Sequence, residues 1–223
     1  MDSIPRDILK KCLGHNGELL FCGHSQLVSL PESICHLNGL QLLYCSYNQL
    51  TKLPESICQL SNLQELKCYN NQLISLPESI GSLSNLQKLV CYNNQLTSLP
   101  ESICQLNNLR ELYCWNNRLT KLPESIGSLS NLRELYCGNN RLTSLPESIC
   151  HLSSLRYLSC YNLLTSLPES ICYLSDLREL HCNDNRLTKL PESIKNSQKN
   201  VANEFKEYLI IDLDTISVIM LFY

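Results

Sequence analysis

A 23-residue period constrains the fold of this chain more than any other feature of its sequence. The tripeptide Leu-Pro-Glu recurs at this spacing, and one interval is a residue shorter. Its prolines are Pro31, Pro54, Pro77, Pro100, Pro123, Pro146, Pro168 and Pro191. A unit of this length cannot bury its apolar side alone, so its leucines must pack against those of the neighbouring units. The period therefore predicts a solenoid of eight stacked coils over residues 17–194.

The apolar residues inside one unit are also regularly spaced. Leu86, Leu89, Cys91, Asn94 and Leu96 follow the pattern L-x-x-L-x-L-x-x-N-x-L, with cysteine at the third apolar position. This pattern resembles the leucine-rich repeat family. The longer form LPxxIxxLxxLxxLxL is similar to intracellular Ras-associated leucine-rich repeat proteins, and the cysteine is similar to repeats encoded by giant DNA viruses of amoebae. The resemblance implies an α/β solenoid, a leucine-rich repeat arc with a parallel β-sheet on its concave face and short helical or 3₁₀ turns on its convex face.

Each part of the unit has an expected physical role. Residues 89–91 are expected to form a short strand that pairs with the same segment one repeat away. Pro100 prevents the strand from continuing, and the Glu-Ser-Ile segment after it returns as a helical or 3₁₀ turn. The Asn94 amide can satisfy the backbone groups that the turn exposes. The sequence therefore predicts a structural ladder of Asn48, Asn71, Asn94, Asn117, Asn140 and Asn185.

Repeat seven departs from this pattern. It reads CYNLLTSLPES where the fourth repeat reads CYNNQLTSLPES, so it is one residue short. Aligned from Cys160, Leu163 falls at the position of the ladder asparagine. This alignment predicts a broken ladder and an irregular turn at residues 161–164, either as sequence drift or as a functional hinge.

The fourteen cysteines follow the repeat. Eight occupy the strand position, namely Cys22, Cys45, Cys68, Cys91, Cys114, Cys137, Cys160 and Cys182. Five follow the isoleucine of the return turn, namely Cys35, Cys58, Cys104, Cys150 and Cys172, and only Cys12 lies outside both sets. Parallel Cβ atoms about 4.8 Å apart do not converge as a disulfide requires, and a straight column makes a poor tetrahedral metal site. We expect buried free thiols rather than disulfides or metal ligands.

Composition and charge exclude several partner classes. A formal charge of −3 over 223 residues gives no attraction to nucleic acid or to a membrane surface. No apolar run is long enough to span a bilayer, no asparagine lies in an N-x-S/T motif, and the start MDSIPRDILKKCL has no signal-peptide core. Together with the free thiols, these features predict a cytoplasmic, reducing location.

Both ends of the chain differ from the repeats. Residues 1–16 are expected to form an N-terminal helical cap, because one stripe of apolar residues follows helical spacing. Residues 195–223 are expected to form a C-terminal cap, a helix followed by an apolar extended segment that shields the last coil. The alternative for the segment 209–223 is a hydrophobic tail that docks on a partner.

Nothing in the sequence resembles an active site. The five histidines lie in different repeats, and there is no Cys-x-x-Cys, phosphate-binding glycine loop or catalytic pair of carboxylates. We therefore expect no catalytic residue, metal, cofactor or small-molecule substrate.

The residues on either side of the strand cysteines are the candidate binding residues. In the leucine-rich repeat family such positions line the concave face, and here they are rich in aromatic side chains. The candidate set is Tyr44, Tyr69, Tyr92, Tyr113, Trp115, Tyr136 and Tyr161. Exposed aromatic residues in a polar surround are typical of protein-binding hot spots. The alternative is structural, because aromatic side chains favour strands and stack along a ladder.

Arginines replace glutamines at two positions of the C-terminal repeats. Arg110, Arg133, Arg156 and Arg178 form one column, and Arg118, Arg141 and Arg186 form the other. An acidic protein segment is therefore a plausible partner, whereas nucleic acid is not. We predict a non-catalytic protein–protein interaction module that binds a protein through the concave face. The alternative is a structural or degenerate solenoid of a multiplied repeat family with no specific ligand.

Overall fold

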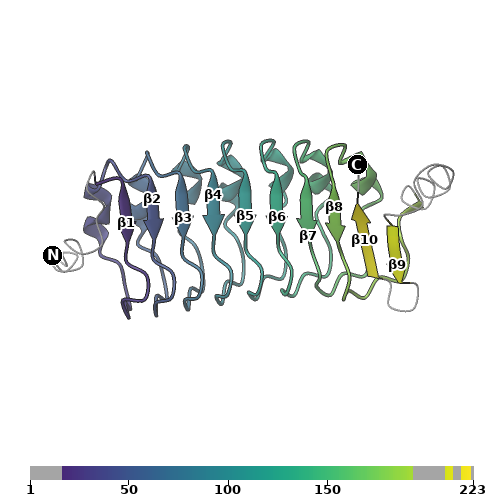
Figure 1. The fold of residues 1–223 in the computed structure, drawn as a ribbon, viewed down its shortest axis with the longest axis horizontal. Coiled ribbons are helices and arrows are strands. Elements are labelled where there is room, and N and C mark those ends of the chain that lie inside the picture. The colour runs from purple at the N-terminus through teal and green to yellow at the C-terminus, as the bar shows by residue number, and fades with distance from the viewer. Residues whose placement is uncertain (1–16, 193–208, 213–216, 222–223) are drawn as a thin grey trace.

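One long parallel β-sheet, backed by short turns, forms the body of the protein (Figure 1). The architecture comes from a computed structural model that describes residues 17–192, 209–212 and 217–221. Eight three-residue strands pair in chain order, each in parallel with the strand one repeat away. They are β1 (Leu19–Phe21), β2 (Leu42–Tyr44), β3 (Glu65–Lys67), β4 (Lys88–Val90), β5 (Glu111–Tyr113), β6 (Glu134–Tyr136), β7 (Tyr157–Ser159) and β8 (Glu179–His181).

Alternation along each strand separates the core from the open face of the sheet. In β5 and the residue after it, Leu112 and Cys114 are fully buried, whereas Glu111 and Tyr113 are half-buried on the other face. The strands begin one residue earlier than expected, as β4 shows, but the Cys91 N–H still donates to the next coil. The predicted solenoid with a parallel sheet is therefore confirmed.

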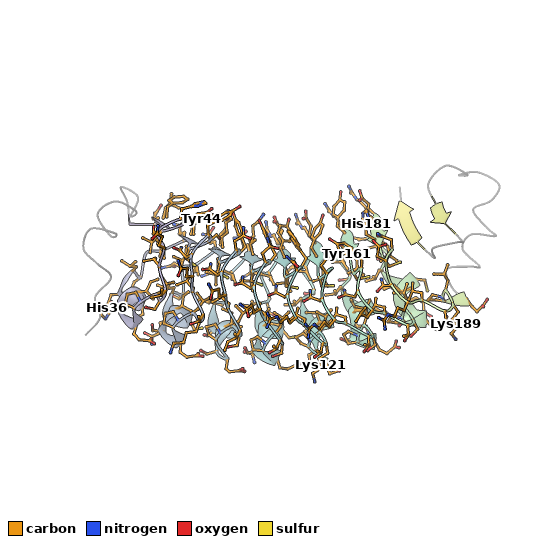
Figure 2. All side chains as sticks on the ribbon, turned by 90° about the horizontal axis from the view of Figure 1, so that it is seen from below. His36, Tyr44, Lys121, Tyr161, His181 and Lys189 are labelled. Carbon is orange, nitrogen blue, oxygen red and sulfur yellow. The ribbon has the colours of Figure 1, made fainter. Side chains whose placement is uncertain are left out.

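Short 3₁₀ helices return the chain on the side away from the sheet. They are η1 (Glu32–His36), η2 (Glu55–Gln59), η3 (Ile80–Ser82), η4 (Glu101–Gln105), η5 (Ile126–Ser128), η6 (Glu147–His151) and η7 (Glu169–Tyr173). Proline precedes the five longer turns and caps them with an extended backbone, as Pro100 does at φ −65° and ψ 144°. Figure 2 shows Lys121 on this side of the arc and Tyr44 on the opposite side, along the sheet.

Leucines and cysteines fill the space between the sheet and the turns. The strand leucines and all eight strand cysteines are buried, and together with the isoleucines of the turns they form one continuous core. The cysteines of the described chain are free thiols. Burial raises the pKa of the Cys91 and Cys137 thiols to about 12, so they stay protonated and unreactive at neutral pH.

Alkylation in neutral buffer should therefore distinguish the accessible thiols of the return turns from the buried thiols of the strands. We expect the exposed Cys172 and the half-buried Cys35 to react in the native protein, while the strand thiols react only after denaturation. Intact mass under non-reducing conditions, before and after denaturation, measures the difference. Fast modification of several strand thiols, or an intramolecular bridge in that column, would contradict this prediction.

Repeat seven keeps the asparagine ladder, so the prediction that Leu163 interrupts it is wrong. Asn162 takes the ladder position: its Oδ1 accepts from the Asn140 N–H at 2.8 Å and its Nδ2 donates to the Cys137 carbonyl at 3.0 Å. Regular coils carry a left-handed residue just before the ladder, such as Asn93 with φ 51°, and repeat seven has none. The missing residue is therefore the left-handed one at the tip of the turn.

Two further strands extend the sheet beyond the repeats. β10 (Ser217–Leu221) pairs antiparallel with β8, and β9 (Leu209–Asp212) pairs antiparallel with β10. They cover the edge that β8 would otherwise expose, and we propose that they serve as the C-terminal cap. The predicted N-terminal cap at residues 1–16 and the predicted helix after residue 195 lie outside the described residues.

Candidate binding surface on the concave face

The concave face of the sheet carries the aromatic residues that the sequence singles out. Figure 2 shows Tyr44, Tyr161 and His181 along this face. All seven candidate side chains are half-buried, because each ring covers its neighbours but keeps one side open to solvent. The strand alternation that sends Leu112 into the core holds Tyr113 and Trp115 on the open face.

Four rings form a continuous row along β2–β5, which we call the ring stack (Tyr47, Tyr69, Tyr92 and Trp115). Tyr92 stacks on Trp115 at 4.4 Å between ring centroids, and Tyr69 stacks on Tyr92 at 4.5 Å. Tyr47 meets Tyr69 edge-on at 5.3 Å, and the Tyr44 hydroxyl lies 3.2 Å from that of Tyr69. The one-repeat spacing of the coils holds the rings at stacking distance.

The remaining candidate residues do not join the ring stack. Tyr113 and Tyr136 form a separate edge-to-face pair at 5.0 Å, which we call the tyrosine pair. Tyr161 lies over Gly138, where a Cβ atom would stand 2.5 Å from the Tyr161 Cζ. Gly138 occupies the slot that Trp115 fills one coil earlier, so the row of rings ends at Trp115. The structure thus brings the seven candidates into two groups, with Tyr161 apart.

Tyr47 belongs to this surface although the sequence analysis missed it. It lies at the left-handed position of the second turn, with φ 55°, and its side chain is 44% exposed. His24 has the same position one coil earlier and stacks on Tyr47 at 4.2 Å. Its place directly before the ladder residue Asn48 is the signal that could have identified it.

The first strand position adds charge to the face. Lys88 bonds to the Glu111 carboxylate and its Nζ lies 5.0 Å from the centroid of the Tyr113 ring. The Tyr113 hydroxyl donates to Glu134. Within the neighbouring strand β3, Lys67 pairs with Glu65 at 2.6 Å. Carboxylates therefore accumulate toward the C-terminal strands, where Glu179 lies 3.0 Å from the His181 Nε2.

The phenol groups of Tyr92, Tyr113 and Tyr136 remain protonated at physiological pH. Burial raises the pKa of Tyr92 to about 12. Burial also raises the pKa of Tyr113 and Tyr136, and in both residues nearby carboxylates such as Glu134 add to this effect. These hydroxyl groups therefore cannot serve as bases at neutral pH. The described residues include no group of three or more metal-ligating side chains, and no described helix is long and apolar enough to cross a membrane.

Family models match most of the described repeats. A leucine-rich repeat region model matches residues 66–145, a model of two leucine-rich repeats matches residues 38–83, and a single-repeat model matches residues 176–197. The chain is a leucine-rich repeat protein. No curated protein matches it in sequence.

Solved structures of other leucine-rich repeat proteins have the same fold. The leucine-rich repeat domain of the type III effector XopL superposes with a TM-score of 0.72 at 27% identity, over 85% of this chain and 76% of that one. A leucine-rich repeat protein of Leptospira interrogans gives a TM-score of 0.59 at 34% identity, and the match covers 78% of this chain and 50% of that one. A chain of the Drosophila Toll–Spatzle complex gives a TM-score of 0.70 at 29% identity, and the match covers 75% of this chain and 23% of that one.

The asparagine ladder holds the coils of this leucine-rich repeat protein at a fixed spacing. The Asn94 Oδ1 accepts from the Leu73 N–H at 3.0 Å, and its Nδ2 donates to the carbonyls of Cys68 and Cys91 at 3.1 and 3.0 Å. Asn48, Asn71, Asn117, Asn140 and Asn185 repeat this bridge between their own coil and the preceding one. The ladder fixes the turns from which the ring stack projects.

The arginine columns flank the strands of the leucine-rich repeat sheet. Arg110 and Arg133 immediately precede β5 and β6, and Arg118 and Arg141 follow the turns of the same repeats. All four side chains are exposed. The described ion pairs involve only lysine or histidine as the cation, so none of them contains these arginines. The two rims of the sheet, at the beginnings and the ends of its strands, are therefore basic, while the C-terminal part of its open face carries carboxylates.

Proposed function

We propose that this leucine-rich repeat protein is a non-catalytic protein–protein interaction module that binds a protein partner through its concave face. One observation carries the proposal: the ring stack lies on the open face of a sheet whose opposite face forms the core. Parallel sheets are normally covered on both faces, so aromatic side chains on an open one are available for a partner. Rigid aromatic rings lose little conformational entropy when a partner covers them.

Structures similar to this chain support binding of proteins or peptides. One is the plant peptide hormone receptor RGFR1 in complex with RGF2, with a TM-score of 0.65 at 29% identity, and this chain spans 32% of the matched chain. Another is the Toll–Spatzle complex. For this chain we propose a protein partner rather than nucleic acid, a membrane or a small molecule, and the free thiols favour a reducing, intracellular location.

The second candidate function is structural. The rings of the ring stack contact one another, and such contacts stabilise a ladder without any ligand. On this alternative the protein is a degenerate solenoid with no specific partner, and Trp115 contributes to stability alone. The two candidates differ in what the loss of Trp115 changes.

Trp115→Ala tests the proposed function. We expect the free energy of unfolding to change by no more than about 1 kcal/mol, because the ring is half-exposed and packs mainly on Tyr92. We expect binding of the captured partner to weaken by about 2 kcal/mol, as truncation of a hot-spot residue does. Affinity capture from the native cell with wild-type and variant baits, followed by titration and thermal unfolding, measures both quantities.

Glu78→Ala is the matched control, since Glu78 is exposed in a return turn on the convex side. It should leave binding unchanged. Full binding by Trp115→Ala, or loss of binding only together with loss of the fold, would make the ring stack structural. The apolar segment 209–223 would then be the next candidate for the binding element.

A further inference from the structure

We propose that the concave face of β5–β8 accepts a lysine or arginine side chain of the partner, between the tyrosine pair and the carboxylates of Glu134 and Glu179. This inference rests on the proposed function, because it names the chemistry that a bound protein segment must present. It concerns the C-terminal part of the face, whereas the ring stack occupies the N-terminal part.

Lys88 shows how this face binds an ammonium group. Its Nζ lies 5.0 Å from the centroid of the Tyr113 ring and bonds to the carboxylate of Glu111. Both partners belong to the next coil, where Glu111 begins β5 and Tyr113 ends it. A tyrosine ring and a carboxylate two residues apart on one strand therefore form a site for a cation that projects from the preceding coil.

The following coil repeats the two acceptors without the lysine. Glu134 begins β6 and Tyr136 ends it, so they have the same relation as Glu111 and Tyr113. The residue that corresponds to Lys88 is Glu111, which is already paired with Lys88. Glu134 accepts from the Tyr113 hydroxyl and takes part in none of the described ion pairs.

The next strands add acceptors and no permanent cation. The first and last positions of β7 and β8 are Tyr157, Ser159, Glu179 and His181, so neither strand has lysine or arginine on this face. Tyr157 lies between Glu134 and Glu179 in the strand register. Burial first, and then the charges of Glu134 and Glu179, raise the pKa of Tyr136, which places both carboxylates near that hydroxyl. Excess negative charge beside open aromatic rings is complementary to a partner cation.

The arginine columns favour a different partner at the two rims of the sheet, where the strands begin and end. Arg110, Arg133 and Arg178 are exposed and immediately precede their strands, so an acidic segment could bind along the rim where the strands begin. Selection of peptides separates the two possibilities, since the two surfaces require opposite charges. A phage-displayed library of random linear peptides, panned on the full chain, is the probe.

The decisive comparison uses a double variant, Glu134→Gln with Glu179→Gln. Glutamine keeps the oxygen that accepts from Tyr113 and the one near His181, so the fold should be retained, as thermal unfolding will check. We expect retained peptides to carry lysine or arginine at a fixed position, to bind the double variant about tenfold more weakly, and to lose their salt dependence there. Glu78→Gln on the convex side is the charge-matched control and should bind as the wild type does.

Each outcome decides the question. Retained peptides without a basic residue, or acidic peptides, would overturn this inference; if Trp115→Ala still weakens their binding, the proposed function stands. Basic peptides that bind the double variant as tightly as the wild type would also overturn it. Failure to retain any peptide would count against both this inference and the proposed function.

Discussion

Replacement of Asn117 by alanine should lower the free energy of unfolding by about 3 kcal/mol. The Asn117 Oδ1 accepts the buried Leu96 N–H at 3.0 Å, and its Nδ2 donates to the carbonyls of Cys91 and Cys114, both at 3.1 Å. Alanine leaves the buried Leu96 N–H without an acceptor, and a buried unsatisfied donor costs about 1–3 kcal/mol by itself. Denaturant unfolding, followed by circular dichroism, measures the loss.

Two comparisons make this prediction specific to the ladder. Asn107→Ala in the preceding repeat should change stability by less than about 0.5 kcal/mol, since Asn107 is exposed. Asn162→Ala should be comparably costly, because the Asn162 Oδ1 accepts from the N–H groups of Asn140 and Leu142 and both would lose their acceptor. Equal losses at Asn117 and Asn107 would contradict the structural role of the ladder.

Gly127→Ala should lower the free energy of unfolding by about 3 kcal/mol, although it adds one methyl group. Gly127 is buried in η5, and a Cβ atom there would stand 2.0 Å from the backbone carbonyl oxygen of Ser148 in the next coil. Because a backbone atom is in the way, the two coils must separate before a side chain fits. The thermal unfolding midpoint of the variant gives the measurement.

Gly39→Ala is the matched control for this prediction. Gly39 is exposed, and a Cβ atom there meets no other atom within 4 Å. The free energy of unfolding of Gly39→Ala should equal or slightly exceed that of the wild type, because alanine restricts the unfolded chain. A Gly127→Ala variant as stable as Gly39→Ala would mean that the coils separate at little cost.

The sequence predicted the fold because one constraint repeats eight times. Buried leucines at fixed spacing, a proline before each return turn and an asparagine at seven of the eight strand turns all favour the same coil. Gly127 could not be interpreted in this way. It stands where other repeats carry cysteine, and only the 2.0 Å approach of the Ser148 carbonyl explains why a side chain is excluded there.

Repeat seven shows where alignment alone fails. Counting from Cys160 places Leu163 at the ladder position, whereas the structure places Asn162 there. Loss of a residue at a left-handed turn tip costs little, since that position is strained for most side chains. Loss of the ladder amide would leave buried backbone groups unsatisfied, so the chain shortens at the tip instead.

The candidate site was only partly predictable from the sequence. Strand alternation places Tyr92, Tyr113 and Trp115 on one face, but their grouping depends on ring orientation and on the gap at Gly138. The sequence analysis did not include Tyr47 among the candidates, because Tyr47 lies at a turn tip rather than beside a strand cysteine. The contact of Lys88 with the Tyr113 ring joins two coils and could not be derived from either one.

Fluorescence quenching of Trp115 tests the binding face most directly, because Trp115 is the single tryptophan of the chain. The half-exposed ring should be quenched by acrylamide in the free protein. With saturating partner, or with a peptide retained by the full chain, we predict a lower quenching constant and a shifted emission maximum, since the partner covers the ring stack. An unchanged quenching constant and emission maximum at saturation would show that the partner binds elsewhere.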